Sequence, residues 1–349
     1  MKKIKRIVFV LIVLVVVIIV AGFFVRRPCY SIHTSGKLYI FNKLSQDVTV
    51  FDLQKGKAIA EIPIEIETHG ATALPNQNQI AVANYGTAQT KGKSIIIINT
   101  EKNCVEKTIE FAGGYKGLDG IVVLQNANKV AVISRISNQF LIVNLEKGTV
   151  ESKVDTQQNM SHFFVFHPCK PLVYVTNIVS GSVSVINLNT NIVCEIIPCG
   201  AGTNGIDITP DGSEVWVANA NNNSISIIST LNNKVIKTLK TGNEPLSLKF
   251  SVDGRYCLVT NLTDGTISVF NQSSCAEIKT ISLHGKKGFV ERLLHHTPRP
   301  VNILLHPNGL YAFVSNSNAN KVEVIDMKTF EIVSSIGTGK VPAAMVFIK

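Results

Sequence analysis

The residues with the clearest chemical potential are two histidines and an aspartate at matching places in a repeated segment. The stretch THGATALP (68–75) aligns with TNGIDITP (203–210), so His69 matches Asn204, and the same register gives Asp119 and His162 in the segments between them. Neutral imidazole and carboxylate are competent ligands for Zn²⁺-like ions. These three side chains are therefore candidates for binding a divalent cation or an acidic ligand.

A plainer interpretation is that each side chain caps the entrance of a strand and hydrogen-bonds nearby backbone, as Asn204 can do without a metal. We favour this strand-capping interpretation over a metal site. The sequence therefore assigns no cofactor, and a divalent ion at His69, Asp119 and His162 is kept as the alternative. Three further copies of the segment are apolar at this position, with Leu246, Val301 and Ala343.

These positions recur because the chain is built from a repeat, whose most regular part is a strand ending in Asn. Typical copies are YVTN (174–177), WVAN (216–219) and LVTN (258–261). With a degenerate AVIS (131–134) included, the terminal positions are 42, 84, 134, 177, 219, 261 and 316, at intervals of 42, 50, 43, 42, 42 and 55 residues. Seven copies at one basic period indicate a repeat protein.

Each copy contains four short runs with strand character. The run VSVINL (183–188) follows YVTN after a turn, and KVIKTLKTG (234–242) is typical of the next run. An inner run with an Asp-Gly turn, such as GIDITPDG (205–212), precedes most Asn-ending strands. Four strands in each of seven repeats predict an all-β, seven-bladed β-propeller of four-stranded blades over residues 37–349.

The two ends of the repeat region predict how the ring closes. The first repeat has no convincing inner strand, because RPCYSIHTSG (27–36) lacks apolar alternation, whereas VPAAMVFI (341–348) is left over and aligns with the inner strands. We expect the C-terminal strand to become the innermost strand of the first blade, which removes two exposed sheet edges. Residues 28–36 are then a short linker.

The blade pattern resembles the YVTN β-propeller repeat proteins of bacterial and archaeal cell surfaces, over about Gly36 to Lys349. The resemblance implies a cell-surface propeller. Together with the membrane anchor and the absence of catalytic motifs described below, this predicts a binding or scaffolding module for a cell-envelope protein, peptide or glycan. Some similar propellers act as lyases, lactonases or metal-dependent oxidoreductases, so an enzyme with its site at the channel mouth is the alternative. The fold alone does not decide between these functions.

The N-terminus is a separate segment with the character of a membrane span. Ile7 to Val25 is an uninterrupted apolar run of 19 residues, with four basic residues before it and two after it. As a helix it would be roughly 28 Å long, close to the hydrocarbon thickness of about 30 Å. Residues 1–27 are predicted to be an uncleaved signal anchor that holds the propeller outside the cell membrane as a single-pass protein. The alternative is a cleaved signal peptide, which would make the protein secreted.

Charge, cysteine content and missing motifs narrow the function. The formal net charge is +10, but it falls to +4 without the six basic residues beside the apolar run. The body has no basic run with interleaved aromatics, so nucleic-acid binding is not expected. The seven cysteines are expected to be mostly unpaired. No local phosphate-loop, G-x-S-x-G, C-x-x-C or H-E-x-x-H motif is present, so any active site must combine loops of different blades.

Irregular residues gather on the face where the inner strands begin, which also receives the loops after the Asn-ending strands. Irregularities in a repeat tend to lie where the function lies. By contrast, His167 and His306 precede tight turns and are interpreted as turn residues, and the strand-ending Asn residues as structural. The predicted ligand-binding face comprises His69, Asp119, His162, Asn204, Tyr85, Arg135, Tyr115, Lys116, His295 and His296.

Overall fold

The computed structural model describes residues 13–14, 29–87, 89–124, 128–285 and 298–349. Within these ranges no helix is both long enough and apolar enough to cross a bilayer. The predicted span from Ile7 to Val25 lies outside the described residues except for Val13 and Leu14. His295 and His296 of the predicted ligand-binding face also lie outside them.

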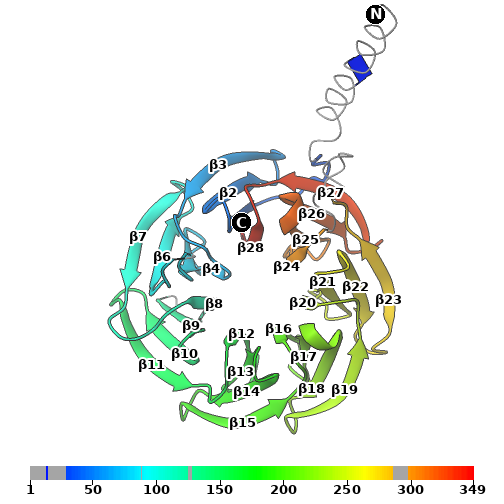
Figure 1. Ribbon diagram of the computed structural model, residues 1–349. Helices are drawn as coiled ribbons and strands as arrows, with labels where there is room; N and C mark the ends of the chain where they lie inside the picture. The colour runs from blue at the N-terminus through cyan, green and yellow to red at the C-terminus, as the bar shows by residue number, and fades with distance from the viewer. Residues whose placement is uncertain (1–12, 15–28, 88, 125–127, 286–297) are drawn as a thin grey trace, which may run out of the picture.

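Seven four-stranded antiparallel sheets stand around a central channel, as predicted from the repeat (Figure 1). From the channel outward, blade 1 contains β28 (Pro342–Ile348), β1 (Lys37–Asn42), β2 (Asp47–Asp52) and β3 (Lys57–Pro63); blade 2 contains β4 (Ala71–Ala73), β5 (Gln79–Ala83), β6 (Ser94–Asn99) and β7 (Cys104–Glu110); blade 3 contains β8 (Leu118–Val123), β9 (Lys129–Ser134), β10 (Gln139–Asn144) and β11 (Thr149–Asp155).

The remaining blades follow the same order. Blade 4 contains β12 (Ser161–Phe166), β13 (Leu172–Asn177), β14 (Ser182–Asn187) and β15 (Ile192–Pro198); blade 5 contains β16 (Thr203–Ile208), β17 (Glu214–Asn219), β18 (Ser224–Ser229) and β19 (Lys234–Lys240); blade 6 contains β20 (Pro245–Phe250), β21 (Tyr256–Asn261), β22 (Thr266–Asn271) and β23 (Glu277–Ser282); blade 7 contains β24 (Pro300–Leu305), β25 (Tyr311–Asn316), β26 (Lys321–Asp326) and β27 (Glu331–Gly337). Two short 3₁₀ turns, η1 (Ala220–Asn222) and η2 (Ser317–Ala319), follow β17 and β25.

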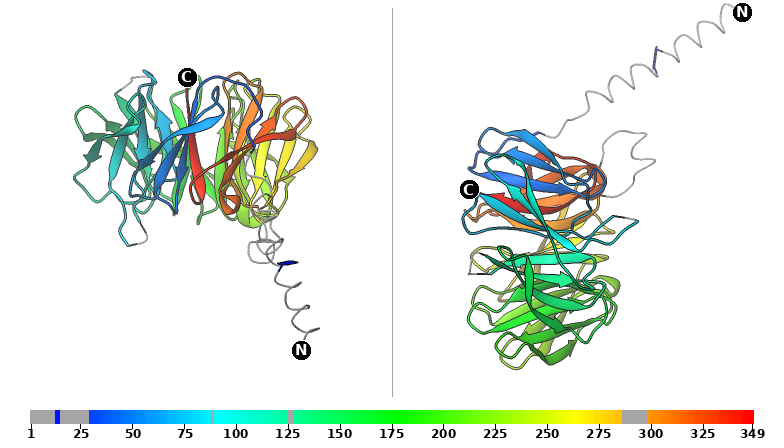
Figure 2. Two further views of the ribbon diagram at one scale, coloured as in Figure 1. Left: turned by 90° about the horizontal axis from the view of Figure 1, so that it is seen from above. Right: turned by 90° about the vertical axis from the view of Figure 1, so that its left-hand side faces the viewer.

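The apolar core lies between neighbouring blades, because strand alternation turns every second side chain toward the next sheet. Trp216 of β17 is fully buried and packs edge-on against Phe250 and Phe270 of blade 6. The blades follow one another in a single ring (Figure 1), which Figure 2 shows edge-on, so a sheet lies on either side of each interface between neighbouring blades. Trp216 is thus a core residue, as its place in the repeat predicts.

Most strand-ending Asn residues bridge their own hairpin at the face where the inner strands begin. The Asn177 Nδ2 donates to Ser182 and Ser184 of the next strand, and Asn219 makes the same two contacts with Ser224 and Ser226. The structural interpretation of these residues is confirmed.

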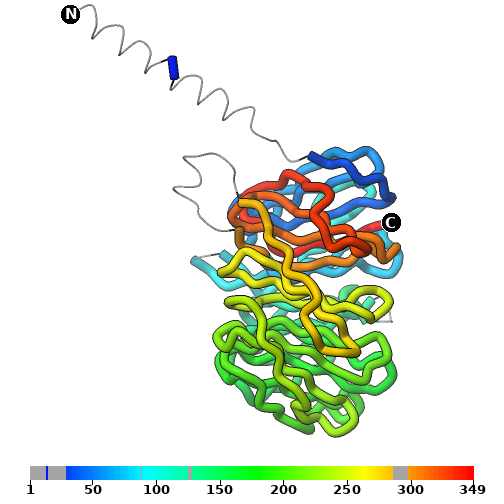
Figure 3. The backbone as a smooth tube through the Cα atoms, turned by 90° about the vertical axis from the view of Figure 1, so that its right-hand side faces the viewer, coloured from blue at the N-terminus to red at the C-terminus, as the bar shows by residue number. Residues whose placement is uncertain are grey.

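The ring closes as the sequence predicts. Strand β28 pairs antiparallel with β1, with Lys37 opposite Ile348 and Tyr39 opposite Val346. Figure 3 shows the first (blue) and last (red) strands side by side. Residues 29–36, which the sequence indicates as a linker, pack across the junction: the Ser335 amide donates to the Cys29 carbonyl, and Ile32 is buried between blades.

Candidate functional site at the channel mouth

The candidate site is built from one position in the inner strands. Strands β8, β12 and β16 each carry a bulge after their first residue, since Leu118, Ser161 and Thr203 pair regularly but the ladder resumes only three residues later. A bulge frees its residues from the ladder and re-aims their side chains. The freed positions include Asp119, His162 and Asn204, the second residues of these strands.

Glycines beside this position let neighbouring inner strands approach closely. A Cβ atom on Gly70 would lie 2.6 Å from the Asp119 carbonyl oxygen, and one on Gly120 would lie 2.8 Å from the His162 carbonyl oxygen. Real side chains do not tolerate such contacts, so only glycine permits this spacing. The pairs His69-Gly70 and Asp119-Gly120 thereby bring the polar side chains of blades 2, 3 and 4 together.

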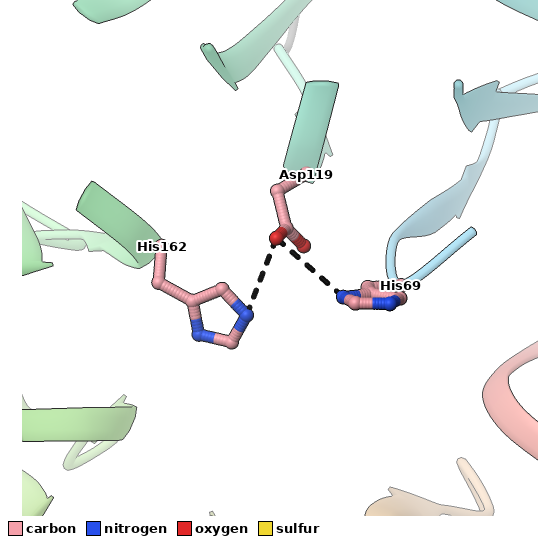
Figure 4. Close-up of side chains that lie close together, drawn as sticks. All are labelled: His69, Asp119 and His162. Carbon is pink, nitrogen blue, oxygen red and sulfur yellow. Dashed lines mark ion pairs between the residues drawn. The ribbon is translucent and has the colours of Figure 1, made fainter. Parts of the chain in front are cut away.

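Asp119 lies at the centre of the cluster (Figure 4). Its side chain is fully buried, and its Oδ2 lies 3.3 Å from His162 Nε2 and 3.6 Å from His69 Nδ1. The Arg135 Nη1 donates to the same oxygen at 3.2 Å. Three residues predicted as one site from their shared register therefore do meet, and Arg135 joins them.

Burial and charge set the protonation of this cluster. Burial alone would raise the pKa of Asp119, but His162, His69 and Arg135 outweigh burial and hold that pKa well below its ordinary value. Burial lowers the pKa of His162 from 6.5 to about 4, against the attraction of Asp119 and with the repulsion of Arg135 and His69. Near neutral pH the cluster therefore contains an ionised carboxylate and a neutral His162.

Tyr85 extends the cluster toward solvent. Its ring stacks on His69 with centroids 4.8 Å apart and planes 13° from parallel. The cations of Lys91 and Arg135 lie 4.6 Å and 5.7 Å from the centre of the Tyr85 ring. Such cation–π contacts hold the ring in place, so Tyr85 positions His69, which is the most exposed of the three metal-ligand candidates.

Several polar atoms of the cluster lack hydrogen-bond partners. Among the described residues, four of the eight buried side-chain N and O atoms without a partner belong to this one site: Asp119 Oδ1, Arg135 Nε, His162 Nδ1 and Asn204 Oδ1. Unpaired buried polar atoms cost free energy, and native proteins contain few of them. Half of these atoms therefore lie in the one cluster around Asp119.

A pocket of about 440 Å³ opens over the cluster at the channel mouth. His69, His162 and Asn204 line one side of it. The pocket also contains cationic residues that the sequence did not single out, namely Lys43 and Arg299. Lys43 follows the Asn-ending strand of blade 1 at the register that Arg135 occupies in blade 3, so extending the register by one residue would have revealed it.

The other predicted residues fall outside the pocket lining. Tyr115 packs partly buried against the core between blades 2 and 3, and Lys116 is exposed, with its backbone amide bonded to Ser134. His167 and His306 are turn residues as predicted, since their Nδ1 atoms accept backbone amides of the turns that follow. All seven cysteines are free thiols, also as predicted.

Comparison with known proteins supports the fold, and one family profile matches part of the chain. A sequence profile of the family "Lactonase, 7-bladed beta-propeller" matches residues 152–282, which is less than half of the chain and includes His162 and Asn204 but not His69, Asp119 or Arg135. No curated protein shows significant sequence similarity to this chain.

Two similar solved structures share the architecture. Kuenenia stuttgartiensis hydrazine synthase is 16% identical with a TM-score of 0.69, covering 86% of this chain and 95% of its own. A functionally unknown protein from Desulfotomaculum acetoxidans DSM 771 is 15% identical with a TM-score of 0.71, covering 90% and 99%. At these identities the likeness shows the fold alone. The lactonase profile favours an enzyme somewhat over a scaffold.

Proposed function

We propose that the protein binds a small organic acid, or the cyclic ester that hydrolyses to one, in the pocket at the channel mouth. The observation that carries this proposal is the mixed lining of the pocket. Basic and imidazole side chains share the lining with aliphatic side chains. A ligand with a carboxylate and an apolar body complements both kinds of side chain.

The basic residues of the pocket differ in whether they already form an ion pair. Lys43 pairs with Glu67 at 3.2 Å, and Arg135 pairs with the buried Asp119. Arg299 lines the pocket, and no carboxylate among the described residues forms an ion pair with it. A guanidinium group binds a carboxylate through two parallel hydrogen bonds. Arg299 is therefore the residue that we assign to ligand charge, and Arg135 of blade 3 adds a second positive charge to the pocket lining.

The aliphatic part of the lining comes from the three blades that lack a polar residue at the key register. Leu246, Val301 and Ala343 lie in the pocket wall, together with Leu262. The volume of about 440 Å³ falls within the range of about 300–1,000 Å³ that small-molecule sites occupy. The key register is thus polar in blades 2 to 5 and apolar in blades 6, 7 and 1, and Arg299 and Lys43 flank strands of blades 7 and 1.

The lactonase profile supports turnover of the ligand as well as binding. In such a reaction water adds its oxygen to the ester carbonyl carbon, the ring acyl–oxygen bond breaks, and the ring oxygen takes up a proton to become a hydroxyl. The new carboxylic acid then ionises. The imidazoles of His69 and His162 are the groups available to activate the water, and Arg135 and Arg299 are placed to stabilise charge on the carbonyl oxygen.

A thermal-shift screen tests the binding proposal. The full-length protein, purified in detergent, is melted with a panel of aliphatic and aromatic carboxylates and with the matching neutral amides. Carboxylates should raise the melting temperature and amides should not. Arg299→Gln should abolish the shift, whereas Arg255→Gln, which removes an exposed arginine paired with Asp253, should leave it intact. Equal shifts from acids and amides would contradict the proposal.

The cellular setting is also a proposal. The apolar run from Ile7 to Val25 supports anchoring of the propeller at the outer side of the cell membrane. In that setting the ligand would come from the cell envelope or its surroundings. A free acid, an acidic glycan or the carboxyl end of a peptide would each present the anionic group that the pocket selects.

A further inference from the structure

We infer that His69, Asp119 and His162 bind one divalent transition-metal ion of the Zn²⁺ class. The three residues come from three consecutive blades and supply two imidazole nitrogens and one carboxylate oxygen. This ligand set is common in zinc sites that keep one position open. The role of the ion rests on the proposed function, because the ion would serve as its cofactor. Binding of the ion is tested separately.

The distances are close to those that a bound ion requires. The three ligand atoms lie within 4.8 Å of one another, and the Asp119 oxygen lies 3.3 Å and 3.6 Å from the two imidazoles. Bonds of about 2.0–2.2 Å in a tetrahedral arrangement place ligand atoms about 3.4 Å apart. Only the separation between the imidazoles must shrink, and His69 has room to move because its side chain is 21% exposed.

The unpartnered atoms of the cluster fit the metal-bound state. When His162 Nε2 binds an ion, the proton of the neutral ring resides on Nδ1 and needs an acceptor. Neither His162 Nδ1 nor Asn204 Oδ1 has a partner within hydrogen-bonding geometry, and both are buried. The Asn204 side chain is nevertheless close enough to His162 to raise the pKa of its imidazole. Metal-ligating histidines usually donate their second N–H to such an oxygen. Asn204 is therefore the positioning residue for His162.

Asp119 also has a carboxylate oxygen without a hydrogen-bond partner. Its side chain is fully buried, its Oδ2 faces both imidazoles and Arg135, and its Oδ1 has no partner. The carboxylate can therefore give one oxygen to the ion and the other to the guanidinium. Arg135 would then orient the carboxylate while its charge limits the affinity for the ion.

The pocket leaves room for a further ligand on the ion. His69 and His162 both line the pocket of about 440 Å³. Zinc in an open site lowers the pKa of a bound water to about 7. With an ion held here, the ion would activate the water for the ester hydrolysis proposed above, and His69 and His162 would act as its ligands in place of acting on the water themselves.

The test is metal binding with no organic ligand present. Full-length protein without a polyhistidine tag is stripped with chelator, and Zn²⁺ binding is measured by calorimetry while Co²⁺ binding is followed by visible absorption. We expect one ion per chain. His69→Asn and His162→Asn should each weaken binding more than about 100-fold, because even loss of an outer partner costs about 10–100-fold. Asn is accepted at this register by Asn204, so the fold should survive.

Two further variants make the result specific. Asn204→Leu should weaken binding about tenfold without abolishing it, and Leu246 shows that leucine fits this register. His33→Asn changes an exposed histidine outside the cluster and should leave the affinity for Zn²⁺ unchanged. Binding of less than a tenth of an equivalent, or unchanged affinity in both histidine variants, would overturn the inference.

The inference and the proposed function fail in different ways. The carboxylate screen is repeated in chelator, where anion binding through Arg299 persists even if no metal site exists. Arg135→Gln should weaken anion binding while keeping or strengthening Zn²⁺ binding, because it removes a cation beside the ion. Loss of Zn²⁺ binding in that variant would contradict the ligand assignment.

Discussion

His162 is a buried histidine that the fold keeps neutral, and this has a consequence for stability. The charged and titratable groups that face it are Asp119, Arg135 and His69. In the unfolded chain it takes up a proton below its ordinary pKa of 6.5, but in the folded protein only near pH 4. Because the unfolded state binds the extra proton, the free energy of unfolding falls as the pH drops through this window.

The expected effect is measurable. In chelator, the wild-type protein should lose about 2 to 3 kcal/mol of stability between pH 7 and pH 4.5 from this one residue, since one pKa unit is worth about 1.4 kcal/mol. His162→Asn should remove that part of the pH dependence. The depressed pKa of Asp119 adds a loss only at still lower pH, so it does not obscure the comparison. Urea unfolding at both pH values checks this, and identical pH dependence in both proteins would count against it.

At the same scale, the sequence predicts some site residues and misses others for physical reasons. His69, Asp119 and His162 are predictable because a repeat places equal positions on one ring. Lys43 was missed because it is one residue beyond the regular part of its copy. Arg299 was missed because it lies two residues before Val301, just outside the inner strand, where the copies of the repeat differ in residue type. No repeat pattern could reveal that Arg135 contacts Asp119, since that contact depends on the bulge.

At the scale of the elements, β28 shows how much depends on one strand. It supplies the inner edge of blade 1, and Val346 and Ile348 are almost fully buried in the core between blades 1 and 2. The sequence predicted this closure because the run 341–348 had no other place in the repeat. The packing of residues 29–36 across the same junction was not predicted, because that segment has no strand alternation and its contacts are with distant residues.

Ending the chain at Lys340 tests the closure. The truncation exposes the β1 edge and the apolar side chains beneath β28, so the remaining protein should lack a cooperative thermal transition by scanning calorimetry. Val341→Ala, which keeps the strand and changes one partly exposed side chain at its start, is the control and should melt cooperatively. A truncated protein that melts like the full chain would show that the ring does not depend on this strand.

At the scale of the whole molecule, we expect the proposed anchor and the propeller to be separable. The strands of the seven blades begin at Lys37, beyond the predicted anchor. We expect the full-length protein to stay in the membrane fraction through an alkaline carbonate wash, because the apolar run can span the bilayer. Deletion of residues 1–27 should release a soluble protein of unchanged strand content by circular dichroism. Release of the full-length protein by carbonate, with its N-terminus intact, would rule out the anchor.

The central claim is that the channel mouth is a binding site for a small organic anion. A crystal structure of the protein with the most stabilising carboxylate from the screen tests it most directly. The account predicts that the carboxylate pairs with Arg299 in the mouth pocket, and that the apolar part of the ligand rests against aliphatic residues of the lining such as Leu246. A ligand bound anywhere else on the propeller, with the mouth pocket empty, would contradict it.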